Sequence, residues 1–382
     1  MNNQKIDFDF NQTQQPLLLM EKALDLLLDT VSVNTNTHNV SLDESLNQVL
    51  AQDICSNINV PGFDNSSMDG YTIALDENNT SMTNQSFDVV DRITAGSTGN
   101  ELKRGNAARI FTGAPIPPGA NTVVMQEECQ ASDDGSQITI KRAINLKENI
   151  RPTGNDILKN DVILSAGKKI EPQDIALAAS VGIAELEVFK KLKVGVFFTG
   201  DELVEPGKPL TPGKIYNSNR YALVALLNKA GCDVINLGNI KDNLDSTCNA
   251  LERLSSECDL IITSGGVSVG EEDHVKPAVE KLGKLSLWRI KMKPGKPLAY
   301  GQVRNIPFIG LPGNPVSALV CGTVFLKPAI NAMLGKGNAA LSTQNAILDR
   351  DLPENGPREH YMRATLKSDN GTQTVEPFDK QD

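Results

Sequence analysis

Hydrophobic positions near the start of the chain follow a helical spacing. Leu17, Met20, Leu24, Leu27, Leu28 and Val31 recur every three to four residues, which is typical of an amphipathic helix. The segment 41–52 repeats this spacing, and Ser41 with Glu44 matches a capping box. A third apolar stripe covers 172–184. We therefore predict helices in these three segments.

The pattern changes between residues 56 and 165. Short apolar runs are separated there by Gly, Pro, Asn and Asp, which favour turns. The clearest runs cover residues 87–93, 107–111, 122–125 and 137–140. This spacing predicts a small all-β domain.

From Leu192 onward, apolar runs alternate with amphipathic segments. The predicted strands cover 194–198, 234–237, 260–263 and 306–309, and the predicted helices cover 219–230, 244–256, 275–282 and 316–326. Strand and helix in alternation predict a doubly wound α/β sheet with right-handed crossovers.

These patterns divide the chain into four predicted domains. Segments 16–55 and 161–190 form a helical linker domain, 56–160 a β-rich domain, and 191–333 the α/β domain. Residues 334–382 begin a small C-terminal β domain, which we expect to be incomplete.

Composition excludes several classes of partner. The 382 residues carry a net charge of −10, without a long cluster of Lys and Arg, so we expect no nucleic-acid binding. No stretch of 18 apolar residues occurs and the N-terminus lacks a secretory pattern, so we expect no membrane span. Six scattered cysteines without a CxxC pair indicate reduced thiols, a core role and a cytoplasmic location.

Candidate chemistry lies in four loops that follow the predicted strands. Ligands of open α/β sheets bind outside the carboxyl ends of the strands. Three of these loops cover 199–202, 263–273 and 311–315, and the fourth contains Lys241 and Asp242. The sequence therefore predicts a ligand site where these loops meet.

The loop 263–273, with sequence TSGGVSVGEED, is the most informative of the four. Its glycines let backbone N–H groups approach a phosphate, and its hydroxyls add donors. Its carboxylates suit Mg²⁺, which takes one or two carboxylates together with substrate phosphates. This combination favours a nucleotide or pyrophosphate site, and a glycine-rich turn with solvated acids is the alternative.

Two other segments allow both a functional and a structural interpretation. Lys291, Lys293 and Lys296 lie among two prolines, either as an anion clamp or as a solvated strand entry. In the β-rich region, segments 64–71, 111–119 and 151–156 are typical of rigid turns.

Taken together, eight segments closely resemble one family, the MoeA-type molybdopterin molybdenumtransferases, which share their fold with the E domain of gephyrin. The matching segments are PGFDNSSMDGYT (61–72), RIFTGAPIPPGAN (109–121), RPTGND (151–156), FFTGDEL (197–203), IYNSNRYAL (215–223), TSGGVSVGEEDHV (263–275), KMKPGKPLAYG (291–301) and GLPGNPVSAL (310–319). They occur in the family's order.

The resemblance implies a fold, a reaction and an assembly. Family members are homodimers in which the site lies between the MogA-like α/β domain of one subunit and the β-rich domain of the other. The implied reaction inserts molybdenum from molybdate into adenylylated molybdopterin, depends on Mg²⁺, releases AMP and forms molybdenum cofactor. The implied partners include a MogA-type adenylyltransferase and molybdoenzyme chaperones. Two alternatives remain: a MogA-like adenylyltransferase that uses ATP, and a non-catalytic scaffold.

The resemblance also assigns site residues. The implied catalytic residues are Asp69, Thr112, Asp156, Glu202 and Asp273, with Glu202 and Asp273 also as Mg²⁺ ligands. The implied substrate-binding residues are Asp242, Ser264, Gly265, Gly266, Ser268, Lys293, Lys296, Pro312 and Pro315. One departure is Arg289, where the family often has a lysine, and a guanidinium presents a planar fork instead of a point charge.

Overall fold

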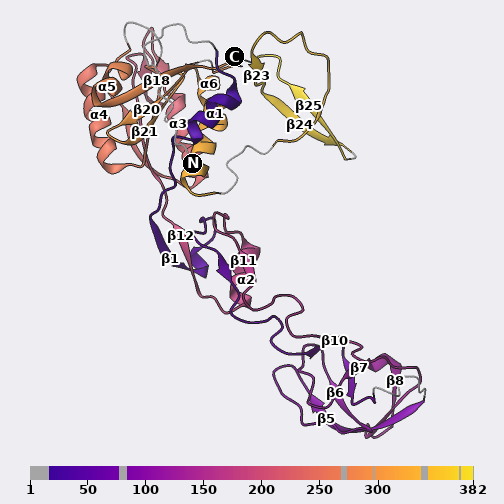
Figure 1. Cartoon of the computed structure of the whole chain (residues 1–382). Helices are drawn as coiled ribbons and strands as arrows, with labels where there is room; N and C mark the ends of the chain where they lie inside the picture. Colours follow the sequence, from indigo (N-terminus) through magenta and orange to yellow (C-terminus); the bar gives the residue numbers. More distant parts are fainter. Residues whose placement is uncertain are drawn as a thin grey trace, which may run out of the picture. The chain divides into compact units, whose positions relative to one another are not determined.

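The computed structural model describes residues 17–76, 84–267, 273–295, 297–336, 343–369 and 371–381 (Figure 1). Contacts divide the chain into two compact units. The first comprises residues 1–52, 166–171 and 185–382, and the second comprises 53–165 and 172–184. Each unit is described by itself.

The first unit is built on a six-stranded mixed sheet in the order β16-β13-β17-β21-β20-β18. Its strands are β13 (Lys193–Phe198), β16 (Asp233–Asn239), β17 (Leu260–Ser264), β18 (Gly283–Arg289), β20 (Pro297–Val303) and β21 (Ile306–Leu311). Strands β16, β13, β17 and β21 are parallel, which confirms the predicted strands and their alternation with helices.

The antiparallel strands β20 and β18 extend the sheet at one side and were not predicted. The prolines of the segment 291–297 indicated a loop. Pro297 instead occupies the first residue of β20, a position where a strand tolerates the missing N–H. The sheet is therefore mixed, with four parallel strands in its doubly wound part.

Helices cover both faces of this sheet (Figure 1). One apolar core joins one face of the sheet to α1 (Met20–Leu28), α3 (Ser218–Ala230), α6 (Pro315–Cys321), the π-helical turn η3 (Gly322–Leu326) and α7 (Lys327–Met333). A second core joins the other face to α4 (Leu244–Glu257) and α5 (Val275–Leu282). With both faces covered, the strand ends are left to carry the polar loops.

Helices α6, η3 and α7 form one continuous run, Pro315–Met333. By length and composition it could cross a membrane, but 61% of its most apolar window is buried within the fold. Phe325 and Ile330 are fully buried in the core that this run shares with the sheet. The run therefore packs as the core helix of the α/β layer.

The predicted helix at 41–52 is wrong. Residues 37–41 form β1 (Thr37–Ser41), which pairs antiparallel with β12 (Glu185–Phe189), and η1 (Leu42–Glu44) is a single 3-10 turn. Asn47 then adopts a left-handed φ of 67°, and the Leu50 amide donates to the Lys168 carbonyl. Long-range backbone pairing overrides the helical spacing here. Within the described part of 16–55, the α-helix is α1, which packs on the α/β sheet.

The second unit has a six-stranded sheet in the order β7-β4-β6-β5-β9-β8, which confirms the predicted β-rich region. Its strands are β4 (Gly70–Ile73), β5 (Gln85–Ile93), β6 (Asn106–Ile110), β7 (Thr122–Met125), β8 (Cys129–Ala131) and β9 (Gln137–Ile140). Smaller elements of this unit are β2 (Ile54–Cys55), β3 (Asn65–Ser66), η2 (Gln126–Glu128), β10 (Ile150–Arg151), β11 (Val162–Leu164) and α2 (Pro172–Ser180).

Short strands complete the first unit. They are β14 (Leu203–Val204), β15 (Ile215–Tyr216), β19 (Met292–Lys293), β22 (Ile347–Leu348), β23 (Glu359–His360), β24 (Ala364–Asp369) and β25 (Thr372–Pro377). Strands β24 and β25 form an antiparallel hairpin, and β23 pairs with β19. The tail thus carries β structure, as predicted.

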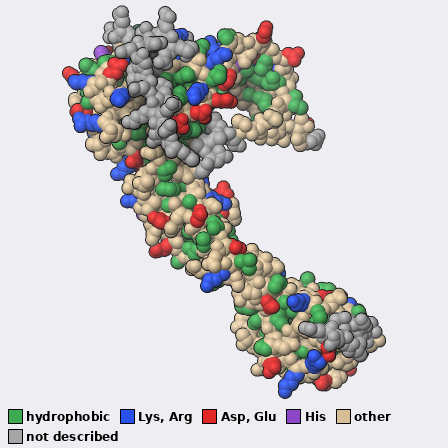
Figure 2. All heavy atoms as spheres, viewed as in Figure 1, with side chains coloured by type: hydrophobic (Ala, Val, Ile, Leu, Met, Phe, Trp, Pro, Cys, Tyr) green, Lys and Arg blue, Asp and Glu red, His purple; other side chains and the backbone are tan. Residues whose placement is uncertain are grey.

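The distribution of surface charges and the burial of the cysteines agree with the predictions from the composition. On the face drawn in Figure 2, basic and acidic side chains are interspersed over the described residues. Four cysteines, Cys232, Cys248, Cys258 and Cys321, are buried, and burial raises the pKa of Cys232 to about 12. These four act as small apolar residues of the core, as predicted.

Candidate functional site

The carboxyl ends of three parallel strands surround a cavity in the first unit. Phe198 of β13 pairs with Ser264 of β17, which in turn pairs with Leu311 of β21. The cavity has a volume of about 310 Å³. It is lined by Thr199, Glu202, Leu203, Ile215, Tyr216, Asn217, Ser218, Asn219, Ser264, Gly265, Gly313, Asn314 and Pro315. Three of the four predicted strand-end loops therefore meet at this cavity, and the fourth, with Lys241 and Asp242, does not line it.

A hydrogen-bond frame ties the loops around this cavity together. Asn219 donates from Nδ2 to Ser264 Oγ at 2.9 Å and to the Gly313 carbonyl at 2.8 Å. Ser264 Oγ donates onward to the Pro312 carbonyl at 2.8 Å. The buried Ser264 hydroxyl thus fixes the loop after β17 to the loop after β21.

Two glycines of the loop after β17 are required by their backbone and by their neighbours. Gly265 and Gly266 have φ angles of +93° and +63°. A Cβ on Gly266 would lie 2.8 Å from Val275 Cγ2 and 3.0 Å from Thr199 Cγ2. The loop is therefore packed tightly against Val275 and Thr199, and Gly265 is part of the cavity lining.

Three carboxylates lie on three different loops around the strand ends. The Glu202 side chain folds back against its own turn. Its Oε2 atom lies 2.6 Å from the position that a Cβ on Gly200 would take. Asp242 accepts a 2.7 Å hydrogen bond from Thr199 Oγ1. Asp273 accepts from the Val275 amide at 3.1 Å at the start of α5. Glu202 lines the cavity itself, whereas Asp242 and Asp273 do not.

These residues fit Mg²⁺ better than a transition metal. The cavity lining supplies oxygen donors and contains neither His nor Cys. Among the described residues, no group of three or more His, Cys, Asp or Glu side chains could form a protein cage for a metal. Mg²⁺ needs no such cage, since it is bound through one or two carboxylates plus water and substrate phosphates.

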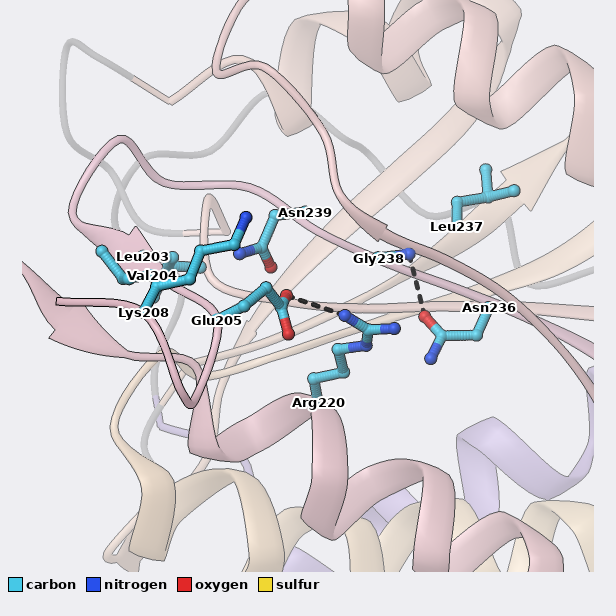
Figure 3. Close-up of a pocket in the computed structure, with 9 residues that line it drawn as sticks. All are labelled: Leu203, Val204, Glu205, Lys208, Arg220, Asn236, Leu237, Gly238 and Asn239. Atoms are coloured by element: carbon cyan, nitrogen blue, oxygen red, sulfur yellow. Dashed lines mark hydrogen bonds and ion pairs between the residues drawn. The ribbon is translucent and has the colours of Figure 1, made fainter.

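A second polar cavity of about 560 Å³ adjoins the first and shares Leu203 with it (Figure 3). Arg220 and Glu205 point toward one another across it and form an ion pair at 2.7 Å. Asn236 and Gly238 of the edge strand β16 contribute a 2.9 Å hydrogen bond to its wall. The strand-end region is thus larger than the first cavity.

The predicted anion clamp begins at the same edge of the sheet. Strand β20 runs antiparallel to β21, so its start at Pro297 lies beside the carboxyl end of β21. Arg289 pairs with Pro297 across β18 and β20. Lys293 is exposed on β19 and does not line the cavity. Burial lowers the pKa of His360, its strand partner, and the positive charge of Lys293 lowers it further.

Some predicted residues lie outside the cavity lining or outside the description. Gly266 and Pro312 neighbour the cavity through the loops that they belong to, and Pro315 is part of its lining. Ser268 and Lys296 lie outside the described residues.

In the second unit, Asp69 and Thr112 form a side-chain clamp. Asp69 Oδ1 accepts from the Thr112 amide and from Thr112 Oγ1, each at 2.8 Å. These two bonds, helped by the charge of Arg109, lower the pKa of Asp69. The clamp therefore keeps an exposed carboxylate ionised and oriented.

A second clamp of the same design lies in the same unit. Asp64 Oδ1 accepts from the Thr153 amide at 2.7 Å and from Thr153 Oγ1 at 2.8 Å, and its pKa is lowered by these bonds. Asp156 follows on the same loop, is exposed, and accepts from Asn155 Nδ2 at 2.8 Å. Among the described residues, no hydrogen bond or ion pair joins Asp156 to Asp69.

Comparison with known proteins identifies the family. Residues 18–182 match the MoeA N-terminal region (domain I and II), and residues 195–332 match a domain described as "Probable molybdopterin binding domain". The chain is 44% identical over 321 residues to molybdopterin molybdenumtransferase of Haemophilus influenzae, a match covering 84% of this chain and 78% of that protein. The chain belongs to the MoeA-type molybdopterin molybdenumtransferase family.

Two further relatives support this assignment. Molybdopterin molybdenumtransferase of Bacillus subtilis is 36% identical over 344 residues, covering 88% of this chain and 80% of that protein. The crystal structure of a molybdopterin biosynthesis MoeA protein from Pyrococcus horikoshii OT3 has a TM-score of 0.81 and 30% identity, covering 94% of this chain and 90% of that chain. The predicted family and its transferase class are confirmed, and the fold is MoeA-like.

Several residues of this MoeA-like site were not predicted. Asn217 and Asn314 cap α3 and α6 by accepting from the Arg220 and Ser317 amides, both at 3.0 Å. Asn219 and Thr199 join the loops, and Thr153 holds Asp64. An asparagine before a helical stripe is a cap signal, so the segment 215–223 could have identified Asn217. The other contacts join residues far apart in sequence, which no local pattern indicates.

Proposed function

We propose that this chain inserts molybdenum from molybdate into adenylylated molybdopterin, releasing AMP and forming molybdenum cofactor. The observation that carries the proposal is the strand-end cavity, in which the backbone of Gly265, the hydroxyl frame of Ser264 and the carboxylate of Glu202 come together. Membership in the molybdopterin molybdenumtransferase family supports it.

The chain's own groups suit cleavage of a phosphoanhydride. When the anhydride breaks, negative charge grows on the phosphate that leaves with AMP. The Gly265 amide already donates to the Leu311 carbonyl at 3.1 Å, so the fixed backbone dipoles that would stabilise such charge are those that follow it in the loop, from Gly266 onward. Mg²⁺, when bound, would offset the same charge as a Lewis acid. Glu202 and Asp273 would hold the ion, and Thr199 would keep Asp242 in place beside them.

Lys293 is proposed to hold an oxyanion at the edge of this site. It lies on β19, in the segment that leads into β20, and β20 begins at Pro297 beside the carboxyl end of β21. Backbone contacts brace the segment: the Tyr361 amide donates to the Lys293 carbonyl at 2.8 Å, and Cys321 Sγ contacts the Gly295 carbonyl at 3.7 Å. A charge-assisted contact here would be worth about 1.5–3 kcal/mol.

We further propose that the active protein is a homodimer in which Asp69 acts with Glu202 of the partner subunit. Asp69→Ala and Glu202→Ala variants should each be inactive. Mixing them with subunit exchange should restore part of the activity, because one site per heterodimer then carries both native residues. No recovery with exchange demonstrated would contradict the shared site.

The decisive experiment measures AMP release by the purified chain from adenylylated molybdopterin. Release should require both molybdate and Mg²⁺ and should accompany formation of cofactor that reactivates an apo-molybdoenzyme. A parallel reaction with ATP and molybdopterin serves as control. Consumption of ATP there, without AMP release in the main reaction, would identify an adenylyltransferase instead. No turnover of either substrate would favour a scaffold.

A further inference from the structure

A cluster of arginines and aromatic rings stands next to the Asp69–Thr112 clamp. Arg92 on β5 and Arg109 on β6 are register partners in a parallel strand pair, so their side chains share one face of the sheet. Their guanidinium carbons lie 4.9 and 5.0 Å from the centre of the Phe111 ring. Phe111 directly precedes Thr112 in the sequence, which places the cluster beside the clamp.

The two arginines differ in how their donors are used. Arg109 also lies 5.0 Å from the Tyr71 ring centre, donates to the Gly70 carbonyl at 3.3 Å and donates to Gln126 Oε1. It is therefore held in place by several neighbours. Arg92 is exposed, and within the described part of the chain its guanidinium contacts the Phe111 ring and forms neither a hydrogen bond nor an ion pair.

Like charges on register partners of neighbouring strands repel one another. The charge of Arg109 acts on the nearby Asp69 carboxylate, whereas among the described residues no carboxylate forms an ion pair with Arg92. The ring contacts offset part of this repulsion. In Arg92 they also leave the N–H groups at the guanidinium edge available, and such an edge matches the oxygens of phosphate-like anions in a two-pronged geometry. The two positive charges of Arg92 and Arg109 would also balance an anion that carries two negative charges.

We propose that Arg92 and Arg109 bind a tetrahedral oxyanion next to Asp69. This inference rests on the proposed function for its setting, since molybdate and the phosphates of adenylylated molybdopterin share this chemistry. Arg92 would bind the anion through its free N–H groups. Arg109, already fixed to Gly70 and Gln126, would supply the second charge from a constant position.

The test measures oxyanion binding by calorimetric titration of the full chain, with molybdate in one arm and inorganic pyrophosphate in the other. Arg92→Gln should weaken binding of at least one anion by about ten-fold or more, as expected for a charge-assisted contact. Arg92→Lys should restore part of the affinity, because it keeps the charge but loses the fork. The arm that responds identifies the source of the oxyanion.

A matched control removes the same charge elsewhere in the same unit. Arg104 is 74% exposed in its side chain and pairs with Asp76 at 2.9 Å, so Arg104→Gln changes the net charge equally. Its binding should equal that of the native chain. Repeating the titrations in a Lys293→Ala background separates the Arg92 contact from the other proposed oxyanion contact.

The outcomes separate this inference from the proposed function. Equal weakening in Arg92→Gln and Arg104→Gln, native affinity in Arg92→Gln, or no binding of either anion by the native chain would each overturn the inference. If binding depends on Arg92 but the native chain releases no AMP from adenylylated molybdopterin, the proposed function fails and the oxyanion site stands. If the native chain releases AMP normally but anion binding does not depend on Arg92, the oxyanion site fails and the proposed function stands.

Discussion

The strand-end cavity of the α/β unit and the loops of the β-rich unit hold their polar groups in different ways. Around the cavity, parallel strands fix where Ser264 and the glycine-rich loop lie, and a buried hydroxyl frame joins the loops. In the β-rich unit, Asp64 and Asp69 lie on exposed loops, and each is held by one threonine. Sheet topology positions the first set, and side-chain hydrogen bonds position the second.

This difference explains what each region tolerates. Backbone fixed by a buried sheet keeps its geometry when a side chain on a loop changes, so chemistry and stability can be separated there. In a loop that is held by a clamp, chemistry and stability change together, because the carboxylate that orients the loop is also the exposed charge. Substitutions in the two regions should therefore give distinguishable results.

The largest effect is expected at Glu202. Glu202→Gln keeps the shape but removes the charge that lines the cavity, so AMP release should fall by about 100- to 1000-fold, as for loss of one preorganised electrostatic group. The melting temperature should stay within a degree or two of the native value, since the loop is fixed by the strands. Steady-state kinetics and thermal unfolding measure the two quantities.

The matched control for this prediction is Asp201→Asn. Asp201 is the neighbouring exposed carboxylate, and it does not line the cavity. Its activity should remain within a few-fold of the native rate. Equal losses in both variants would show that general charge, and not the position of Glu202, determines turnover.

A second prediction tests how tightly the strand-end loop is packed. Gly266→Ala adds a left-handed strain of about 1–2 kcal/mol and a clash with Val275 and Thr199 that costs about 1–3 kcal/mol more. Gly105→Ala in the β-rich unit adds the strain alone, because a Cβ there meets no atom within 4 Å. Calorimetry should show a clearly larger loss of stability for Gly266→Ala. Similar losses would mean that the loop can move away from its neighbours.

Most of the α/β unit was predictable because its apolar runs are buried on both faces. Strands β13, β17 and β21 are continuous apolar segments between amphipathic helices, and their order implies a site at the carboxyl ends. Glu202, Ser264 and Gly265 could therefore be placed near one another from the sequence.

The remainder depended on contacts that join distant residues. The spacing of Leu42, Leu46, Val49 and Leu50 is helical, yet the segment holds one 3-10 turn, and backbone bridges of Val49 to Lys169 and of Leu50 to Val188 replace the predicted helix. Asp69 with Thr112 and Asp64 with Thr153 are separated by 43 and 89 residues, and short turn-like motifs do not indicate such partners. Only the family resemblance singled out Asp69 and Thr112.

A third prediction concerns ion pairs that hold the β-rich unit. Arg142 forms ion pairs with Glu128 and Glu148 and donates to the Ala143 carbonyl at 2.8 Å. Hydrogen bonding to Arg142 lowers the pKa of Glu148. Arg142→Gln should reduce stability by about 1–3 kcal/mol, because charged partners are left unpaired.

The comparison for Arg142 lies on a helix of the α/β unit. Arg253 pairs with Glu257 at 3.2 Å on the exposed side of α4. Arg253→Gln should change stability by less than about 0.5 kcal/mol, as is usual for an exposed pair four residues apart. Chemical denaturation of both variants, followed by the fluorescence of a probe in each unit, checks the order. A larger effect at Arg253 would contradict the difference between the units.

The smallest effect is expected from acid titration of the two clamps. The amide and hydroxyl of Thr153 lower the pKa of Asp64, and those of Thr112 lower the pKa of Asp69. A lowered pKa in the folded state adds stability that is complete above the ordinary aspartate value of about 3.9 and is lost as the pH falls below it, through the lowered value.

Asp64→Asn keeps an oxygen that accepts both bonds but cannot titrate. Hydrogen exchange of the segment 151–156 should therefore be slower in the native chain than in Asp64→Asn near pH 6. The two rates should approach one another as the pH falls below about 3.9 and through the lowered pKa of Asp64, and an exposed aspartate changed in the same unit, Asp133→Asn, should show no such approach. A difference between native chain and Asp64→Asn that stays constant from pH 6 to pH 3 would mean that the charge of Asp64 does not hold the loop, and that the backbone of the β-rich unit fixes it as the sheet fixes the strand-end loops.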